Sequence, residues 1–238
     1  MHDIPRLLDR LEALHGRAER RLAVDPLDEL VACILSQHTS DINTARAFEG
    51  LRRAFPSWEA VAQAPAESVA DAIRCGGLAD TKAPRIQAVL RAVAARFGRM
   101  DLADLDAWPT PEARAFLMGL PGVGPKTAAI VLCFAMGRPV LPVDTHVFRV
   151  SWQLGLVPKQ AGEARAHDLL QPLVPDELVY RFHIALIRHG RAVCRAQRPR
   201  CGECQLASVC PVGEAMVSGL PDPSADARLQ GSHPQPGA

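Results

Sequence analysis

The chain of 238 residues is 48% hydrophobic and 22% charged, with a formal net charge of +1 and a mean hydropathy of +0.01. This balance is typical of a globular protein with a sizeable core, and it excludes a disordered or fibrous chain. The longest apolar run, residues 128–136, is far shorter than the roughly 20 residues that a membrane-spanning helix needs. We therefore expect a cytoplasmic protein that does not associate with membranes.

The basic residues are unevenly distributed along the chain. No acidic residue lies between Glu177 and Glu203, a stretch that contains six arginines: Arg181, Arg188, Arg191, Arg195, Arg198 and Arg200. This clustering predicts a basic face formed by the last third of the chain. A solvated helix end and loop would show the same pattern.

In chain order, apolar residues recur at helical spacing over residues 4–14, 27–35, 86–97 and 178–186. No segment shows sustained strand-like alternation, and Pro and Gly residues interrupt the helical pattern often. These features predict an all-α protein of short helices with short connections. Residues 213–238 are polar, rich in Pro and Gly and without a period, which predicts a disordered tail.

The segment 120–127, LPGVGPKT, follows one apolar helical pattern and precedes another, so it predicts a helix, a tight hairpin and a second helix. Gly122 and Gly124 can adopt positive φ, and without side chains they let a phosphate approach backbone N–H groups at a helix N-terminus. The hairpin formed by Gly122, Val123 and Gly124 is therefore a candidate contact with a nucleic-acid backbone. A plain turn with Pro125 at the first helical position would also explain the glycines.

Lys126 lies in the first turn of the second helix, where a cation opposes the helix macrodipole. The residues after it are almost all apolar, so the neutral amine is favoured over the ammonium ion. A neutral amine is a nucleophile. The chain has only three lysines against 24 arginines, so we expect an amine here to serve chemistry rather than charge alone.

Asp144 precedes a further helical pattern in PVDTHVFR, residues 142–149. An aspartate at this place caps the helix N-terminus by accepting a backbone N–H bond. A carboxylate held there can also stabilise developing positive charge or assist proton transfer. The two roles are compatible, so Asp144 is a second candidate catalytic residue.

Four of the seven cysteines fall within seventeen residues, spaced C-x6-C-x2-C-x5-C: Cys194, Cys201, Cys204 and Cys210. In a chain without a secretion signal, such clustering favours a metal site over disulfides. Four thiolates can bind zinc or an iron–sulfur cluster, and the spacing leaves both open. Cys33, Cys75 and Cys133 lie singly in apolar helical patterns and are expected in the core.

Taken together and in this order, LPGVGPKTA, VDTHVFRV and the four-cysteine spacing strongly resemble the endonuclease III family of helix-hairpin-helix DNA glycosylases. The resemblance spans roughly residues 5–210 and includes the segments ILSQHTSD and GLADTKA. It implies two helical lobes with a DNA-binding cleft between them. One lobe would be a six-helix barrel over residues 27–137, and the other an iron–sulfur cluster domain from residues 1–26 and 138–212.

By the same resemblance, Lys126 matches the catalytic lysine that attacks the sugar C1′ of a damaged nucleotide, and Asp144 matches the catalytic aspartate. The four cysteines match the ligands of a structural [4Fe–4S] cluster. Leu78 falls where the family has an apolar wedge for the gap left by a flipped nucleotide. His38 falls where relatives often carry a glutamine that probes the orphaned base. An exposed loop leucine and a helix-end histidine are the plain alternatives.

Two positions depart from the family pattern. His38 replaces the usual glutamine, and Met118 stands where some relatives have a glutamate just before the hairpin. Recognition of the damaged base is therefore expected to differ in detail. Arg149 and Arg191 are expected to contact DNA, although surface roles on their helices would also account for them.

The sequence thus predicts a bifunctional DNA glycosylase and abasic-site lyase of base excision repair, which removes oxidised pyrimidines such as thymine glycol through a lysine Schiff base and β-elimination. Its partner would be double-stranded DNA that contains a damaged pyrimidine or an abasic site, bound by a monomer associated with the nucleoid. A mismatch-specific DNA glycosylase and a non-enzymatic DNA-binding iron–sulfur module are the alternatives. Lys126 argues against both, since mismatch-specific relatives typically lack it and simple binding does not require it.

Overall fold

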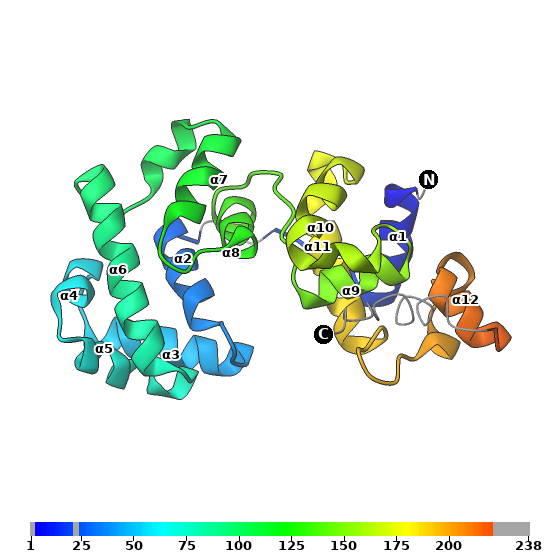
Figure 1. The fold of residues 1–238 in the computed structure, drawn as a ribbon, viewed down its shortest axis with the longest axis horizontal. Helices are drawn as coiled ribbons and strands as arrows, with labels where there is room; N and C mark the ends of the chain where they lie inside the picture. Colours follow the sequence, from blue (N-terminus) through cyan, green and yellow to red (C-terminus); the bar gives the residue numbers. More distant parts are fainter. Residues whose placement is uncertain (1–2, 21–23, 221–238) are drawn as a thin grey trace, which may run out of the picture. The chain divides into compact units, whose positions relative to one another are not determined.

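The structure is a computed structural model that describes residues 3–20 and 24–220. Every regular element within these ranges is a helix, which confirms the predicted all-α class. The chain divides into two compact units, Met1–Arg20 with Val143–Ala238 and Arg21–Pro142 (Figure 1). Within the described ranges, no helix has the length and hydropathy needed to span a membrane.

The division falls at residues 20/21 and 142/143, whereas the sequence placed it at 26/27 and 137/138. Arg138 explains part of the difference, because its guanidinium donates to the carbonyl oxygens of Trp108, at 2.9 Å, and Leu105. The buried side chains of Val140 and Leu141 also belong to this unit. Residues 138–142 are therefore held by the helices that precede them.

In the unit Arg21–Pro142, the first three helices begin at side-chain caps. Asp25 accepts the N–H groups of Leu27 and Asp28, and Ser40 and Ser57 each accept one from the residue three positions on. Such caps set where each helix begins. The elements before the hairpin are α2 (Pro26–Leu35), α3 (Asp41–Ala54), α4 (Trp58–Gln63), α5 (Ala66–Ala72), η1 (Arg74–Gly76) and α6 (Ala79–Phe97).

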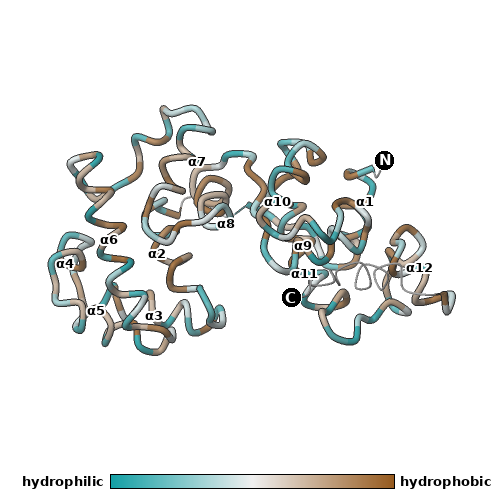
Figure 2. The backbone as a smooth tube through the Cα atoms, viewed as in Figure 1, coloured by the Kyte–Doolittle hydropathy of each residue, from teal (hydrophilic) through white to brown (hydrophobic). Residues whose placement is uncertain are grey.

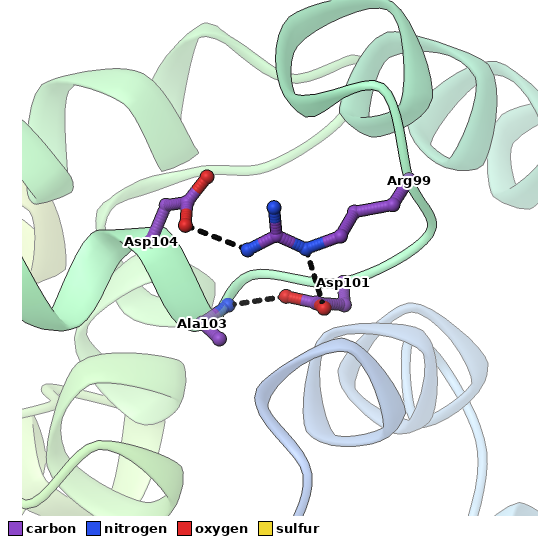
Figure 3. A network of polar contacts seen from close by, with 4 residues as sticks. All are labelled: Arg99, Asp101, Ala103 and Asp104. Carbon is purple, nitrogen blue, oxygen red and sulfur yellow. Dashed lines mark hydrogen bonds and ion pairs between the residues drawn. The ribbon is translucent and has the colours of Figure 1, made fainter.

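Beyond α6 the chain passes through a charged loop. Arg99 pairs with Asp101 at 2.8 Å and with Asp104 at 2.6 Å, and Asp101 also accepts the backbone N–H of Ala103 (Figure 3). The apolar helical pattern predicted after the hairpin changes from an α-helix to a π-helical turn. The elements are η2 (Ala103–Ala107), α7 (Thr110–Gly119), α8 (Pro125–Ile130) and the π-helical η3 (Val131–Ala135).

The apolar stripes predicted for residues 27–35 and 86–97 form the core of this unit. Leu27 and Ile34 of α2 are fully buried, and so is Leu90 of α6. Figure 2 shows hydrophobic residues along α2 and α8. Burial of one such side chain contributes roughly 1.5–3 kcal/mol. Packing, more than intrinsic helix propensity, therefore holds these short helices.

The other unit joins the N-terminal helix to the C-terminal part of the chain. Arg181 pairs with Glu12, and Arg188 donates to the carbonyl oxygens of His15 and Gly16 at 3.2 and 2.8 Å. Of the clustered arginines, Arg181 is thus paired with a carboxylate, whereas Arg188 binds neutral carbonyl groups, stays exposed and keeps its charge on the predicted basic face. The elements are α1 (Ile4–His15), α9 (Thr145–Gln153), η4 (Lys159–Ala161), α10 (Gly162–Leu170), η5 (Gln171–Leu173), η6 (Asp176–Leu178), α11 (Val179–Ala192), η7 (Cys201–Glu203), η8 (Ala207–Val209) and α12 (Pro211–Ser218).

The helix α12 contradicts part of the predicted tail. Residues 213–218 belong to this helix, although the sequence placed them in a disordered segment. Val212 and Ala215 are buried, and the Sγ atom of Cys210 accepts the backbone N–H of Gly213 at 3.3 Å. Tertiary packing and a helix cap thus order residues 213–218, whose sequence shows no helical periodicity. Of the rest of the predicted tail, Gly219 caps the end of α12, and residues 221–238 lie outside the described residues.

Candidate functional site

The hairpin between α7 and α8 spans residues 120–124. Gly122 adopts φ +72°, in the left-handed region that favours glycine. Gly124 has φ −98° and ψ −179°, so the positive φ expected at both glycines is found at Gly122 but not at Gly124. Gly124 is extended because it is the N-cap residue of α8, followed by Pro125 at the first helical position. Val123 is only 6% exposed, so its side chain anchors the turn in the core.

Arg85 of α6 lies directly beside Gly122. A Cβ atom at Gly122 would lie 2.5 Å from Cδ and 2.6 Å from Nε of Arg85. The guanidinium also donates from Nη1 to Oε1 of Gln37 at 2.8 Å. The missing side chain of Gly122 therefore makes room for a protein cation, which adds positive charge beside the hairpin. Arg85 was not among the predicted site residues, because no local pattern connects residue 85 with residue 122.

Lys126 is the second residue of α8, and its side chain is exposed. Thr127, Ala128 and Ala129, which follow it, are buried. The expectation that apolar neighbours would enclose the amine is wrong, because these residues face the core and Lys126 does not. Lys126 opposes the dipole of α8, and the first turn of this helix contains no acidic residue to offset its charge.

Cys33 of α2 lies within electrostatic reach of Lys126, and Glu29 lies beside Cys33. Burial raises the pKa of Cys33, Glu29 raises it further, and the charge of Lys126 opposes the rise. Burial also raises the pKa of Glu29, whose Oε1 atom is 3.8 Å from the Cys33 Sγ atom.

The three single cysteines were expected in the core. Cys33 and Cys133 are buried as predicted. Cys75 is exposed instead, because it lies in the short surface turn η1.

His38 and Leu78, the predicted gap-filling residues, are both exposed and have left-handed backbones. Their φ angles are +56° and +51°, and Leu78 is 55% exposed. Within the described ranges, the only other non-glycine residue with positive φ is Arg198. Such strain costs roughly 1–3 kcal/mol and is typical of functional positions. A left-handed residue also commonly follows a helix end, so the roles of His38 and Leu78 in filling the gap stay predictions beside the plain alternatives. Met118, near the end of α7, is 40% exposed.

Asp144 belongs to the other unit, where it begins α9. Its Oδ1 atom accepts the backbone N–H of Val147 at 2.7 Å. The predicted helix cap is therefore confirmed. The bond holds a half-buried carboxylate at the helix N-terminus, where the helix dipole favours its negative charge. A catalytic role for Asp144 stays a prediction.

Arg149 of α9 links this helix to the end of α11. Its Nε atom donates to the carbonyl of Cys194 at 3.0 Å, and its Nη2 atom donates to that of Gly190 at 2.9 Å and lies 3.1 Å from Nδ1 of His146. The guanidinium thus binds within its own unit, beside the start of the cysteine cluster. Arg191, by contrast, has an exposed side chain. Phosphate contacts by both arginines stay predictions.

The four clustered cysteines all border one cavity. Its wall contains Cys194, Cys201, Cys204 and Cys210 together with Val150, Gln153, Leu154, His189, Val193, Leu206 and Gly213. The Sγ atom of Cys210 donates to the carbonyl of Gln153 at 3.1 Å, and that of Cys204 lies 3.6 Å from Nε2 of His189. Residues spread over α9, α11 and the following loop thus place the four cysteines around one cavity.

The chemistry of this donor set fits a metal centre that binds thiolates. Burial raises the pKa of Cys194 to about 12 and also raises the pKa values of Cys204 and Cys210. Metal cations in the cavity would stabilise the thiolate charge that burial disfavours. Across the described part of the chain, no three His, Cys, Asp or Glu side chains form a group that could hold one metal ion, so the fit rests on the shared cavity and the chemistry of the thiols, not on a formed set of ligands.

Comparison with known proteins places the chain in a family. The family model for the HhH-GPD superfamily of base excision DNA repair proteins matches residues 31–175. Endonuclease III of Thermotoga maritima is 34% identical over 186 residues, which cover 78% of this chain and 83% of the relative. A putative DNA glycosylase of Arabidopsis thaliana is 41% identical over 165 residues, 69% of this chain, and the chain spans 56% of that protein's length.

Solved structures give the same result. A non-covalent endonuclease III–DNA complex superposes with a TM-score of 0.77 at 29% identity, covering 92% of this chain and 100% of that one. A trapped endonuclease III–DNA covalent intermediate gives a TM-score of 0.76 at 29% identity, with 91% and 100% covered. The chain therefore belongs to the HhH-GPD superfamily of base excision DNA repair proteins and, within it, to the endonuclease III family of DNA glycosylase/lyase enzymes.

Proposed function

We propose that this protein is a bifunctional DNA glycosylase and abasic-site lyase that removes oxidised pyrimidines, of the thymine glycol type, from double-stranded DNA. One observation carries the proposal. Lys126 stands exposed in the first turn of the helix that follows the glycine hairpin, in a chain of the endonuclease III family. An exposed amine supports a nucleophile, and the adjacent hairpin supports a contact with the DNA backbone.

In the proposed reaction, the neutral Nζ atom of Lys126 attacks C1′ of the damaged nucleotide. The bond from C1′ to the base breaks, and the base leaves with the electron pair and takes up a proton. The nitrogen then loses one proton, the C1′–O4′ bond breaks as O4′ takes up a proton, and the opened sugar is held as a protonated imine. The imine acidifies the 2′ hydrogen, whose removal expels the 3′ phosphate by β-elimination. Asp144 is assigned to stabilise positive charge on the sugar and to move protons.

His38 and Leu78 are assigned to the gap that the flipped nucleotide leaves in the duplex. Their exposure and left-handed backbones support this role. The ring nitrogens of His38 offer a donor and an acceptor to the orphaned base, where a glutamine would offer an amide. The hairpin and Arg191 are assigned to phosphates. The internal bonds of Arg149 favour a role in holding the cysteine loop.

The four cysteines are proposed to hold a [4Fe–4S] cluster. When bound, it would supply structural support by tying residues 194–210 into one loop. The shared cavity and the family membership support this assignment. Visible absorption of freshly purified protein tests it, since an iron–sulfur cluster is coloured and zinc is not. We further propose that the enzyme acts as a monomer on nucleoid DNA in the cytoplasm.

Borohydride trapping on a duplex with a single thymine glycol tests the reaction. Reduction of the imine should leave a covalent adduct between protein and DNA, visible by denaturing electrophoresis, together with release of the modified base. Release without an adduct would contradict the lysine mechanism. A lesion that stays intact would contradict the proposed substrate, thymine glycol. Duplexes with a mismatch and with a plain abasic site would then be tested, to distinguish a mismatch glycosylase or a lyase from a protein that only binds DNA.

A further inference from the structure

Lys82 of α6 is a buried cation that joins two surface segments. Its side chain is among the largest in the structure that are fully buried, at 2% exposure for the residue. The Nζ atom donates to the carbonyl oxygen of Leu35 at 2.6 Å and to that of Gly76 at 2.9 Å. Burial also lowers the pKa of Lys82. A buried ammonium ion is costly, so its two bonds must offset a desolvation penalty that an apolar residue would avoid.

Both carbonyl groups lie at the end of a helix. Leu35 is the last residue of α2, and Gly76 is the last residue of η1. The final carbonyls of a helix have no following turn to bond to, and a cation favours this end of the dipole. Lys82 therefore fixes the places where α2 and η1 stop and the next segments begin.

The segments that begin at these two points carry the candidate gap-filling residues. His38 follows Leu35 by three residues, and Leu78 follows Gly76 by two. Both residues are exposed and left-handed, with φ of +56° and +51°. A strained backbone persists only where its surroundings hold it. One buried ammonium group thus ties together the starts of two strained, exposed segments that lie far apart in the sequence.

We infer that Lys82 is a positioning residue, which presets His38 and Leu78 together so that both enter the duplex as the damaged nucleotide leaves it. The inference rests on the proposed function, because it gives Lys82 the role of supporting, from below, two residues that are proposed to enter the DNA. Lys82 itself is buried and does not touch DNA. Its contribution is to lower the cost of ordering the two segments when the duplex opens.

Gln87, one turn and a residue further along α6, provides a matched comparison. It is 4% exposed, and its Nε2 atom donates to the carbonyl oxygens of Val61, at 2.9 Å, and Ala64, at 2.7 Å. This side chain also joins buried backbone groups, at the end of α4. No left-handed residue lies in that part of the described structure. Loss of Gln87 should therefore weaken packing without disturbing His38 or Leu78.

The test compares Lys82→Met with Gln87→Met in the full-length protein. Two rates are measured for each: removal of thymine glycol from a duplex in a single turnover, which requires a base pair to open, and borohydride trapping on an abasic duplex, which has no such pair. Lys82→Met should lower the first rate relative to the second by roughly tenfold or more, as expected for a misplaced group. Gln87→Met should leave their ratio unchanged.

A fluorescent reporter makes the test independent of turnover. With 2-aminopurine opposite the lesion, binding by wild type and Gln87→Met should raise the fluorescence as the orphaned base unstacks, and Lys82→Met should give a smaller rise. If Lys82→Met does not fold, Lys82→Gln takes its place, because glutamine keeps an amide donor without the charge. Lys82→Arg, which keeps the charge, should bring the ratio of the two rates part of the way back to the wild-type value. An unchanged ratio in a folded Lys82 variant would overturn the inference. Absence of base removal by wild type would instead overturn the proposed function.

Discussion

The two helices that carry the candidate catalytic residues begin in different ways. α9 begins with Asp144, whose carboxylate accepts a backbone N–H in the first turn. α8 begins with Gly124, which supplies no side-chain cap, and its first turn contains the cation Lys126. Asp144 stabilises the start of its helix, whereas Lys126 does not. Lys126, which has no structural use, is therefore the clearer catalytic candidate, whereas Asp144 needs variants that separate its two roles.

Replacement of the nucleophile should have the largest effect. Lys126→Gln should abolish the borohydride adduct and base release, because an amide cannot form the imine. Its free energy of unfolding should stay unchanged or rise by about 0.3–1 kcal/mol, since the charge that opposes the dipole is gone. Trapping and urea denaturation measure the two effects. Loss of duplex binding in the folded variant would contradict a purely catalytic role.

Two substitutions at Asp144 separate the helix cap from the chemistry. Asparagine also caps helices, so Asp144→Asn should keep the free energy of unfolding while base removal falls strongly. Asp144→Ala should lose the activity and, in addition, about 1 kcal/mol of stability. Single-turnover base removal and urea denaturation distinguish these outcomes. Full activity in Asp144→Asn would mean that the residue serves only as a cap.

The hairpin that precedes Lys126 offers a second contrast. Gly122→Ala should lower the free energy of unfolding by about 1–3 kcal/mol, because φ is +72° and the new Cβ would meet Arg85. Gly124→Ala should cost less than about 0.5 kcal/mol, since φ is −98° and no heavy atom lies within 4 Å of its Cβ position. Arg85→Ala should recover part of the loss in Gly122→Ala. Equal costs for the two glycines would refute this account.

Glu12, unlike Lys126, is a charged residue with a clear structural partner, Arg181, and its removal should have a small effect. The hydrogen bond from Arg181 lowers the pKa of Glu12. The folded pKa is therefore below the unfolded value, so this pair stabilises the fold above the unfolded pKa and the contribution is lost as pH falls through the folded pKa. Glu12→Gln should cost up to about 1 kcal/mol at neutral pH. Denaturation between neutral and acid pH should show a smaller decline for the variant.

Much of the local structure followed from sequence alone. The stripes over 27–35 and 86–97 became buried helix faces, and the LPGVGPKT segment became a hairpin between two helices. These features depend on neighbours within one or two turns, so spacing is enough to predict them. Errors arose where distant contacts decided the outcome. The exposure of Lys126, the helix at 213–218 and the exposure of Cys75 each depend on packing that no short window contains.

The sequence by itself determined the all-helical class, the position of the hairpin, the amine that follows it and the clustering of four thiols, because each is a matter of spacing along one segment. Only the tertiary structure decided that Arg85 lies beside Gly122, that Lys82 joins Leu35 to Gly76, and that the four cysteines border one cavity. These contacts join segments that are far apart in the chain. Their free energy comes from burial and hydrogen bonds formed only when the whole unit folds, and so no local pattern records them.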